Sequence, residues 1–210
     1  ERAEAIPEPS TRARTAARLR SANAADEAAA ESRERELGEQ VLSQVTKNKL
    51  TDPSQIPVGD WIALDTERRQ SIGALLGHNL RGDEPKSDPT LFNQLTTEIT
   101  RAPRAFAQRD LVPFVGRLPT AQWQRLRDWQ AGLRRNDPTT EDELYAIKRG
   151  LQIAGKTLPD SDSGMAEDNK AARRADLVEE IDTWRRINGK SPDDIAIRAM
   201  LDRQLAPVSL

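Results

Sequence analysis

The chain has 210 residues, of which 36% are hydrophobic, only 4% aromatic and 31% charged, so we expect a thin core under a strongly solvated surface. Its formal net charge of -2 argues against a dedicated nucleic-acid-binding domain, whose usual signature is a basic excess. The absence of cysteine excludes disulfides, zinc–thiolate sites and cysteine nucleophiles, and no apolar run approaches the roughly 18 residues of a membrane-spanning helix.

The first predicted element is a long N-terminal helix. Ser10 is a candidate N-cap, and residues 11–49 contain no proline and many Ala, Arg and Glu residues, which favour helix formation. Such a helix would be roughly 55–60 Å long. It has little apolar surface, so we expect it to pack against copies of itself or against another part of a parent protein. A partly disordered, Ala-rich linker is the alternative.

The start of the chain suggests a longer parent. The first residue is Glu1, and Pro7 and Pro9 follow within the first ten residues. We therefore expect an internal segment, or the ordered part, of a longer polypeptide. A processed N-terminus is the alternative.

An apolar stripe marks the second half of the predicted helix. Leu37, Val41 and Val45 have the i, i+4, i+8 spacing of one helical face. Because the first half offers mostly alanine, these three residues are the candidate oligomer interface.

A basic cluster lies near the start of the same helix. Its members are Arg12, Arg14, Arg18 and Arg20, with no acidic residue between them. They are candidates for contact with phosphate, on DNA or on lipid head groups. We favour the simpler interpretation, in which they pair with the acidic stretch 26–31 of a neighbouring helix. No aromatic residue lies among them, so stacking on single-stranded bases is not indicated.

Residues 51–59 contain Pro53, Pro57 and Gly59, which predict a break between two parts of the chain. We therefore expect an extended helix over 1–50 and a helical domain over 51–210. Residues that are typical of helix ends divide the second part into about seven short to medium helices. The expected starts are Asp65, Asp88-Pro89, Pro103, Pro119, the capping box Thr140–Glu143, Glu167 and Ser191-Pro192. The expected stops include Gly82, Gly155 with Pro159, and Gly189, and 160–164 is a polar loop.

The apolar residues of these helices recur at helical spacing, and no segment alternates in the manner of a strand, so the fold class is all-α. The four tryptophans are expected to be core anchors. Trp129 is the expected exception, because Trp123 and Leu126 already define the buried face of its helix. Other expected core positions are Leu64, Ile72, Leu76, Leu80, Leu91, Phe92, Leu95, Ile99, Leu144, Ile147, Leu151, Leu177, Ile181, Ile195, Met200, Leu201 and Leu205.

The sequence offers no catalytic constellation. His78 is the only histidine, so neither a metal site nor a triad is indicated, and a position near a helix C-terminus explains it. Most carboxylates lie at helical spacing from Arg or Lys, as Glu180 does from Arg185. Glu31-Ser32 matches the start of a lytic transglycosylase motif, but the rest of the motif does not follow. We therefore expect no enzyme activity, cofactor or metal.

The order of helix starts and anchors from Trp61 onward resembles a known family. The residues that carry the resemblance are Trp61–Leu64 before Asp65, Asp88–Phe92, Pro103–Phe106, Leu118–Trp123 and Ile187–Pro192. This order, over roughly residues 60–210, is similar to a helical region of the internal virion, or DNA-ejection, proteins of short-tailed (podovirus-type) bacteriophages. Pro119 departs from the Ser or Thr cap that is usual there.

The resemblance implies a structural segment that leaves the capsid with the genome and oligomerises to help form a conduit across the host cell envelope. It implies a location in the virion, and after delivery in the host periplasm or cell envelope. The implied partners are further copies of the chain, other virion or tail proteins and, transiently and non-specifically, phage DNA, with no small-molecule substrate. One alternative is a helical adaptor or scaffolding segment. Another is an accessory region beside a hydrolase domain elsewhere in the parent protein.

Overall fold

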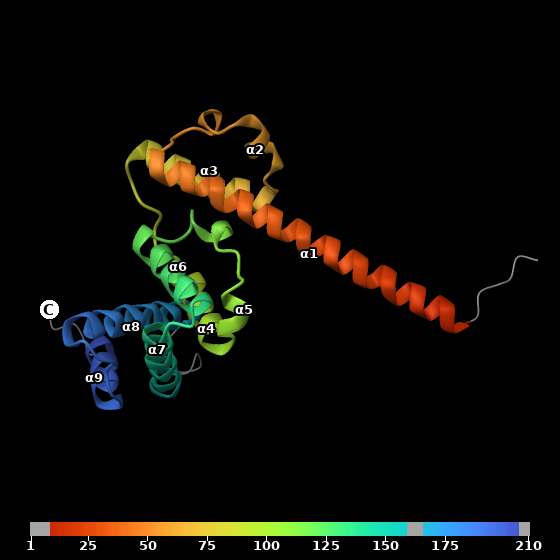
Figure 1. Ribbon diagram of the computed structural model, residues 1–210. Coiled ribbons are helices and arrows are strands. Elements are labelled where there is room, and N and C mark those ends of the chain that lie inside the picture. The colour runs from red at the N-terminus through yellow and green to blue at the C-terminus, as the bar shows by residue number, and fades with distance from the viewer. Residues whose placement is uncertain (1–8, 159–165, 206–210) are drawn as a thin grey trace, which may run out of the picture. The chain divides into compact units, whose positions relative to one another are not determined.

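The computed structural model describes residues 9–158 and 166–205, with side chains described from residue 16 onward. Within these ranges every regular element is helical and no strand occurs, so the all-α prediction is confirmed (Figure 1). The α-helices are α1 (Pro9–Asn48), α2 (Val58–Ala63), α3 (Thr66–Arg81), α4 (Pro89–Arg101), α5 (Pro103–Phe106), α6 (Thr120–Arg134), α7 (Pro138–Thr157), α8 (Glu167–Asn188) and α9 (Asp194–Leu205). Two short 3₁₀ turns, η1 (Pro53–Gln55) and η2 (Val112–Phe114), complete the set.

Contacts divide the chain into two compact units, Glu1–Arg81 and Gly82–Leu210. This division differs from the boundary expected after residue 50. The reason is that α2 and α3 pack against α1, so the segment after the break folds back onto the long helix instead of joining the domain that follows.

The long helix α1 is continuous, as expected, but it begins at Pro9, so Ser10 lies inside the helix and is not its N-cap. Proline is well suited to a first helical position, where its missing N–H has no intrahelical partner. The helix ends where Lys49 adopts a left-handed conformation, with φ of 49°. The side chain of Asp52 then accepts a hydrogen bond from the Ser54 N–H at 2.8 Å and starts η1.

The core of the first unit is small. It consists of side chains from α1, from the loops before and after α2, and from α3, namely Val41, Leu42, Val45, Ile56, Leu64, Ile72 and Leu76. Asp65 caps α3 as expected, because its carboxylate accepts a hydrogen bond from the Arg68 N–H at 2.8 Å. Gly82, with φ of 70°, ends the helix as expected. Leu80, on the last turn of α3, was expected to be buried, but its side chain is 70% exposed.

The N-terminal part of α1 contributes nothing to this core. Every residue from 17 to 29 is exposed, and this stretch of the helix extends past α2 and α3 in Figure 1. Six of these thirteen positions are alanine, and Leu19, 60% exposed, is the one large apolar side chain among them, so the exposed surface is narrow and mostly free of large apolar groups.

The second unit is organised around α4, which packs against α5, α6, α7 and α8. The prediction for its buried face is confirmed, since Leu91, Phe92, Leu95 and Ile99 are all buried. The helix starts where predicted, with the Asp88 carboxylate accepting a hydrogen bond from the Leu91 N–H at 2.9 Å and Pro89 at the first helical position. The helices α7, α8 and α9 pack on one another and extend the core through Ile147, Leu177, Ile181, Ile197 and Leu201.

Two predicted helix starts are wrong by a few residues. Helix α7 begins at Pro138, where Asp137 is the cap and accepts a hydrogen bond from the Thr139 N–H, so Thr140 is the third helical residue and not a cap. Helix α9 begins at Asp194, and the cap is Asp193, whose carboxylate accepts from the Ala196 N–H. In both places the helix is capped by the aspartate next to the proline and not by the nearby Thr or Ser. The reason is that a carboxylate is a stronger hydrogen-bond acceptor at a helix N-terminus than a hydroxyl group.

Two further details differ from the sequence-based expectation. Gly155 lies inside α7, which continues to Thr157, and Pro159 together with 160–164 falls outside the described residues. Ile195 is exposed on α9, and Ile197 takes the core position instead. By contrast, Gly189 ends α8 in a left-handed conformation, with φ of 65°, as predicted.

Candidate functional site

The predicted oligomer interface coincides with the core of the first unit. Val41 and Val45 are both 0% exposed, and Leu37 is half-buried. The valines lie where α1 packs with α2 and α3, so they already have partners within the chain. The stripe was recognised correctly as a buried face, but the assignment of the valines to an interface between copies is corrected by this packing. An interface that includes Leu37 stays a prediction.

The predicted basic cluster is only partly described. The side chains of Arg12 and Arg14 lie outside the described residues, whereas Arg18 and Arg20 are exposed. The Arg20 Nε donates to the Ala16 carbonyl oxygen at 3.2 Å, which is a contact within the same helix. Among the described residues, the structure brings no carboxylate within ion-pair distance of Arg18 or Arg20. Their charges are therefore available to an external partner.

A network of charged residues joins α6, α7 and α8 in the second unit. Glu143 of α7 accepts a hydrogen bond from the Trp129 Nε1 of α6 at 2.8 Å, and the Arg185 guanidinium of α8 lies 3.5 Å from the same carboxylate. Nearby, Asp182 of α8 forms ion pairs with Arg125 and Arg186. Trp129 is thus buried, contrary to the sequence-based expectation, because the indole N–H has a partner on the neighbouring helix.

Burial raises the pKa of the Glu143 carboxyl above its ordinary value. The loss of solvation is the largest cause, and the negative charge of Asp182 adds to it, against the opposing effects of the Trp129 hydrogen bond and the positive charge of Arg185. The Glu143 carboxylate contacts Trp129 and Arg185, and the Asp182 carboxylate contacts Arg125 and Arg186. Contacts of this kind hold neighbouring helices together. Arg185 also lies 3.5 Å from Asp142, and Asp142 in turn accepts from the Ser191 hydroxyl. The network therefore connects α6, α7, α8 and the loop between α8 and α9.

The raised pKa makes the stability of the second unit depend on pH. A folded-state pKa above the unfolded value of about 4.5 means that the folded chain binds the proton more tightly. The free energy of unfolding should therefore fall as the pH rises from about 4.5 through the folded-state pKa. We expect Glu143→Gln to remove this fall, as measured by urea unfolding over a series of pH values. Glu141→Gln is the matched control on the exposed side of α7, and an identical pH profile for the wild type and Glu143→Gln would contradict the assignment.

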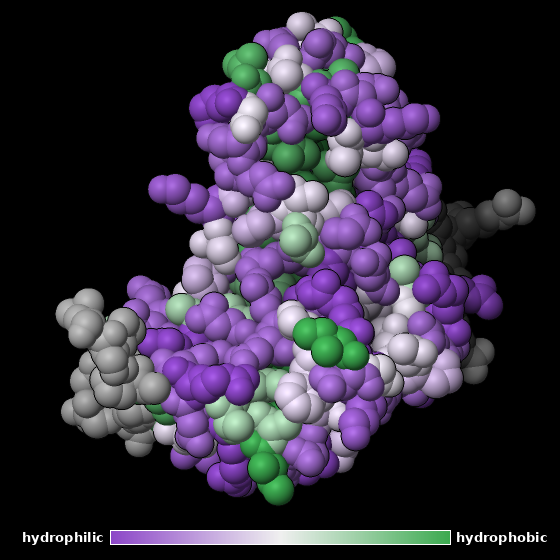
Figure 2. Space-filling model, turned by 90° about the vertical axis from the view of Figure 1, so that its left-hand side faces the viewer, coloured by the Kyte–Doolittle hydropathy of each residue, from purple (hydrophilic) through white to green (hydrophobic). Residues whose placement is uncertain are grey.

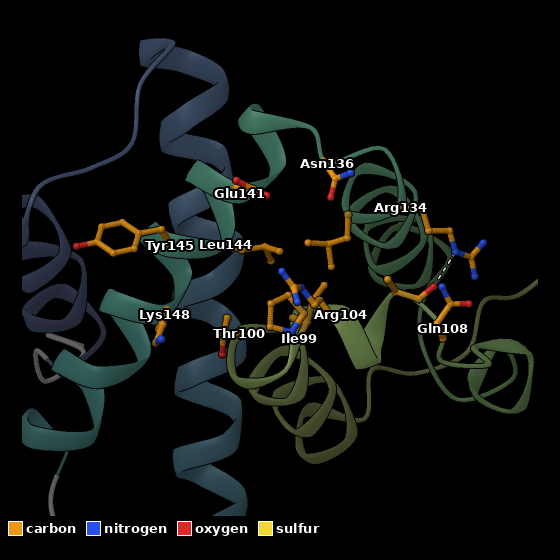
Figure 3. Close-up of a pocket in the computed structure, with 13 residues that line it drawn as sticks. Ile99, Thr100, Arg104, Gln108, Arg134, Asn136, Glu141, Leu144, Tyr145 and Lys148 are labelled. Carbon is orange, nitrogen blue, oxygen red and sulfur yellow. Dashed lines mark hydrogen bonds between the residues drawn. The ribbon is translucent and has the colours of Figure 1, made fainter.

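A cleft of about 550 Å³ lies between α4, α5, α6 and α7 (Figure 3). We call it the α4–α7 cleft. Apolar side chains form its floor, with Ile99, Leu133 and Leu144 as the largest, and Leu144 points into it in Figure 3. Its rim carries three cations, Arg104, Arg134 and Lys148, and one carboxylate, Glu141. No sequence motif marks this site, because its lining residues come mainly from four separate helices.

Three further features of the described residues bear on function: possible metal ligands, the histidine and the hydropathy of the helices. No group of three or more His, Asp or Glu side chains there is placed to hold a metal ion. His78 lies near the C-terminus of α3 as expected, with its Nδ1 3.0 Å from an Arg81 nitrogen. None of the helices that the structure describes is both long and apolar enough to cross a membrane. Figure 2 shows a face on which hydrophilic side chains predominate and hydrophobic ones form small separate patches.

Comparisons with known proteins found no match: no family model, no curated protein and no solved structure is significantly similar to the chain.

Proposed function

We propose that this chain is a structural segment of a phage internal virion (DNA-ejection) protein, which oligomerises through α1 and so helps to form a conduit for genome delivery across the host cell envelope. The exposed stretch of α1, residues 17–29, is the observation that supports the proposal most directly. The order of helix starts in residues 60–210 supports the type of parent protein.

The exposed stretch has the properties of a surface that neighbours cover. It spans about 20 Å of helix axis without contributing to the core of its own unit. Helical segments of this length gain most of their stability from packing and not from intrinsic propensity. Because alanine side chains are small, two alanine-rich helices can pack with their axes close together. Such packing buries the surface near the backbone of each helix even without large side chains. Association between copies would therefore stabilise this part of the helix.

The charges along α1 favour a particular arrangement of neighbours. Arg18 and Arg20 precede the exposed acids Asp26 and Glu27 by about two helical turns. If neighbouring copies run parallel with a stagger of about seven residues, roughly 10 Å, Arg20 of one copy lies beside Glu27 of the next. Such a head-to-tail contact uses two different surfaces of each copy, so it closes into a ring or continues into a tube. A ring or tube is the assembly that a conduit requires.

Charge reversal tests this arrangement. We expect the double variant Arg18→Glu/Arg20→Glu to weaken self-association by about tenfold, because attraction between neighbours becomes repulsion. Asp26→Lys/Glu27→Lys should have a similar effect, and an equimolar mixture of the two double variants should associate again. The mass of the purified chain, measured by sedimentation over a range of concentrations and at low and moderate salt, reports the outcome. Lys190→Glu, an exposed change in the second unit, is the control.

Two outcomes would contradict the proposal. A wild-type chain that stays monomeric at every concentration would remove the basis for an oligomeric conduit. Equal weakening by Lys190→Glu would show that net charge, and not the α1 surface, controls association. Negative-stain images of the parent protein provide a second readout, in which rings or tubes are expected.

The alternative function is a helical adaptor or scaffolding segment that binds a different protein. Val58 and Ile62, four residues apart on α2, favour it, since their side chains are 70% and 66% exposed and lie on one face of the helix. An adaptor predicts a monomeric chain that forms a defined complex with its partner. Val58→Ser/Ile62→Ser should then abolish that complex and leave the mass of the isolated chain unchanged.

A further inference from the structure

The α4–α7 cleft is independent of the proposed assembly surface. All of its lining residues belong to the unit Gly82–Leu210, whereas the exposed stretch of α1 belongs to the other unit. Its volume of about 550 Å³ lies within the range of roughly 300–1,000 Å³ that is typical of small-molecule sites. A cleft of this size is large enough for a small ligand and too small to enclose a folded segment.

The floor of the cleft provides apolar surface. Leu133 of α6, which is half-buried, and Pro103 of α5 and Tyr145 of α7, which are exposed, supply most of its accessible apolar surface. Ile99 and Leu144 also line the cleft but are only 0% and 6% exposed. Because these residues are held by the packing of three helices, the floor is preformed. An apolar body placed on it would lose contact with water at little cost in protein reorganisation.

The rim of the cleft is positively charged. Arg134 is fixed in place, because its Nε donates to the Ala107 carbonyl oxygen at 2.7 Å, and this leaves its two terminal nitrogens available (Figure 3). Arg104 lies close to Ile99 in Figure 3, and Lys148 extends from α7 on the opposite side. Within the described parts of the chain, no carboxylate forms an ion pair with Arg104, Arg134 or Lys148. Only Glu141 opposes these three cations among the lining residues.

We propose that the α4–α7 cleft binds a small amphiphilic anion, with a carboxylate or phosphate head group at the cationic rim and an apolar body on the floor. The planar guanidinium group of Arg104 is suited to bind either head group through paired N–H donors, and the charges of Arg134 and Lys148 on the two sides of the cleft make the rim favourable for an anion. A free fatty acid and a lipid-derived phosphate share this chemistry. The cleft thus gives the second unit a ligand-binding role that is separate from assembly through α1.

Calorimetric titration of the full chain tests the proposal. The probes are decanoate and decyl phosphate, each kept below the concentration at which it forms micelles, with decanol as the uncharged control and hexanoate as the shorter one. The variants are Arg104→Glu and Lys148→Glu, both at exposed positions of the rim, and Lys190→Glu is the control for net charge. Circular dichroism of each variant confirms that the helices are intact.

We expect at least one of the two decyl anions to bind, and the preferred one identifies the head group. Arg104→Glu and Lys148→Glu should each weaken its binding by about tenfold or more, whereas Lys190→Glu should change it less than twofold. Decanol should bind at least tenfold more weakly than the preferred anion. Decanoate should bind more tightly than hexanoate, by up to about fourfold for each methylene that reaches the floor. The proposal is overturned if neither anion binds, if decanol binds as tightly, or if Lys190→Glu weakens binding as much as the rim variants.

Discussion

Phe92→Ala is expected to lower the free energy of unfolding of the second unit by about 3–5 kcal/mol. Phe92 is fully buried on α4, the helix against which four of the other helices of this unit pack. Removal of its ring leaves a cavity that several rigid helices surround, and they cannot close it without giving up contacts with one another. The chain contains only 4% aromatic residues, so few other large side chains are present to fill the space.

Urea unfolding, followed by circular dichroism and by tryptophan fluorescence, measures this loss. Ile195→Ala is the matched control, because Ile195 belongs to the same unit and its side chain is 79% exposed. We expect this variant to change the free energy of unfolding by less than about 0.5 kcal/mol. A loss at Phe92 as small as the loss at Ile195 would contradict the central position of α4 in the core.

Gly132→Ala is expected to destabilise the second unit by about 2–3 kcal/mol, although alanine is the better helix former. Gly132 is buried where α6 meets the start of α7. A Cβ atom added there would lie 2.7 Å from the Thr140 Cβ and 2.9 Å from its Cγ2. The Cβ of Thr140 is attached directly to the backbone of α7, so the two helices would have to move apart to relieve the clash.

Gly155→Ala is the matched control for this prediction. Gly155 lies on the exposed side of α7, and a Cβ added there meets no atom within 4 Å. The same chemical change should therefore stabilise the chain by about 0.5–1 kcal/mol, through higher helix propensity alone. Thermal unfolding of both variants gives the comparison. Opposite signs are expected, and a stabilising Gly132→Ala would show that α6 and α7 do not approach as closely as the structure describes.

The parts of the fold that local chemistry controls were predictable from the sequence. An aspartate followed by a proline marked the start of α4, and a glycine with a positive φ marked the ends of α3 and α8. These signals act within four or five residues, because caps and left-handed glycines satisfy the backbone groups of their own helix end. The start of α7 carries the same signal in Asp137-Pro138, and the sequence-based prediction missed it by favouring the capping box that follows.

The features that depend on distant parts of the chain were not predictable. The stripe of Val41 and Val45 showed that one face of α1 is buried, but periodicity alone does not identify what covers that face. The covering elements, α2 and α3, belong to the segment that was assigned to the other domain. For the same reason, the sequence did not reveal the partner of Glu143 on α6 or the cationic rim of the α4–α7 cleft. Each of these combines residues that lie on different helices.

The exposed stretch of α1 also bears on how this chain can change in length. Core helices tolerate insertions poorly, since an added residue rotates every following side chain by about 100°. In the exposed stretch, an insertion of seven residues would lengthen the helix by about 10 Å. Because seven residues make almost two full turns, the parts of the helix before and after the insertion would rotate relative to each other by only about 20°. The core around Val41 and Val45 would keep its orientation. An insertion in this stretch would therefore leave the core of the first unit intact, but between Arg20 and Glu27 it would change the spacing on which the proposed contact between copies depends.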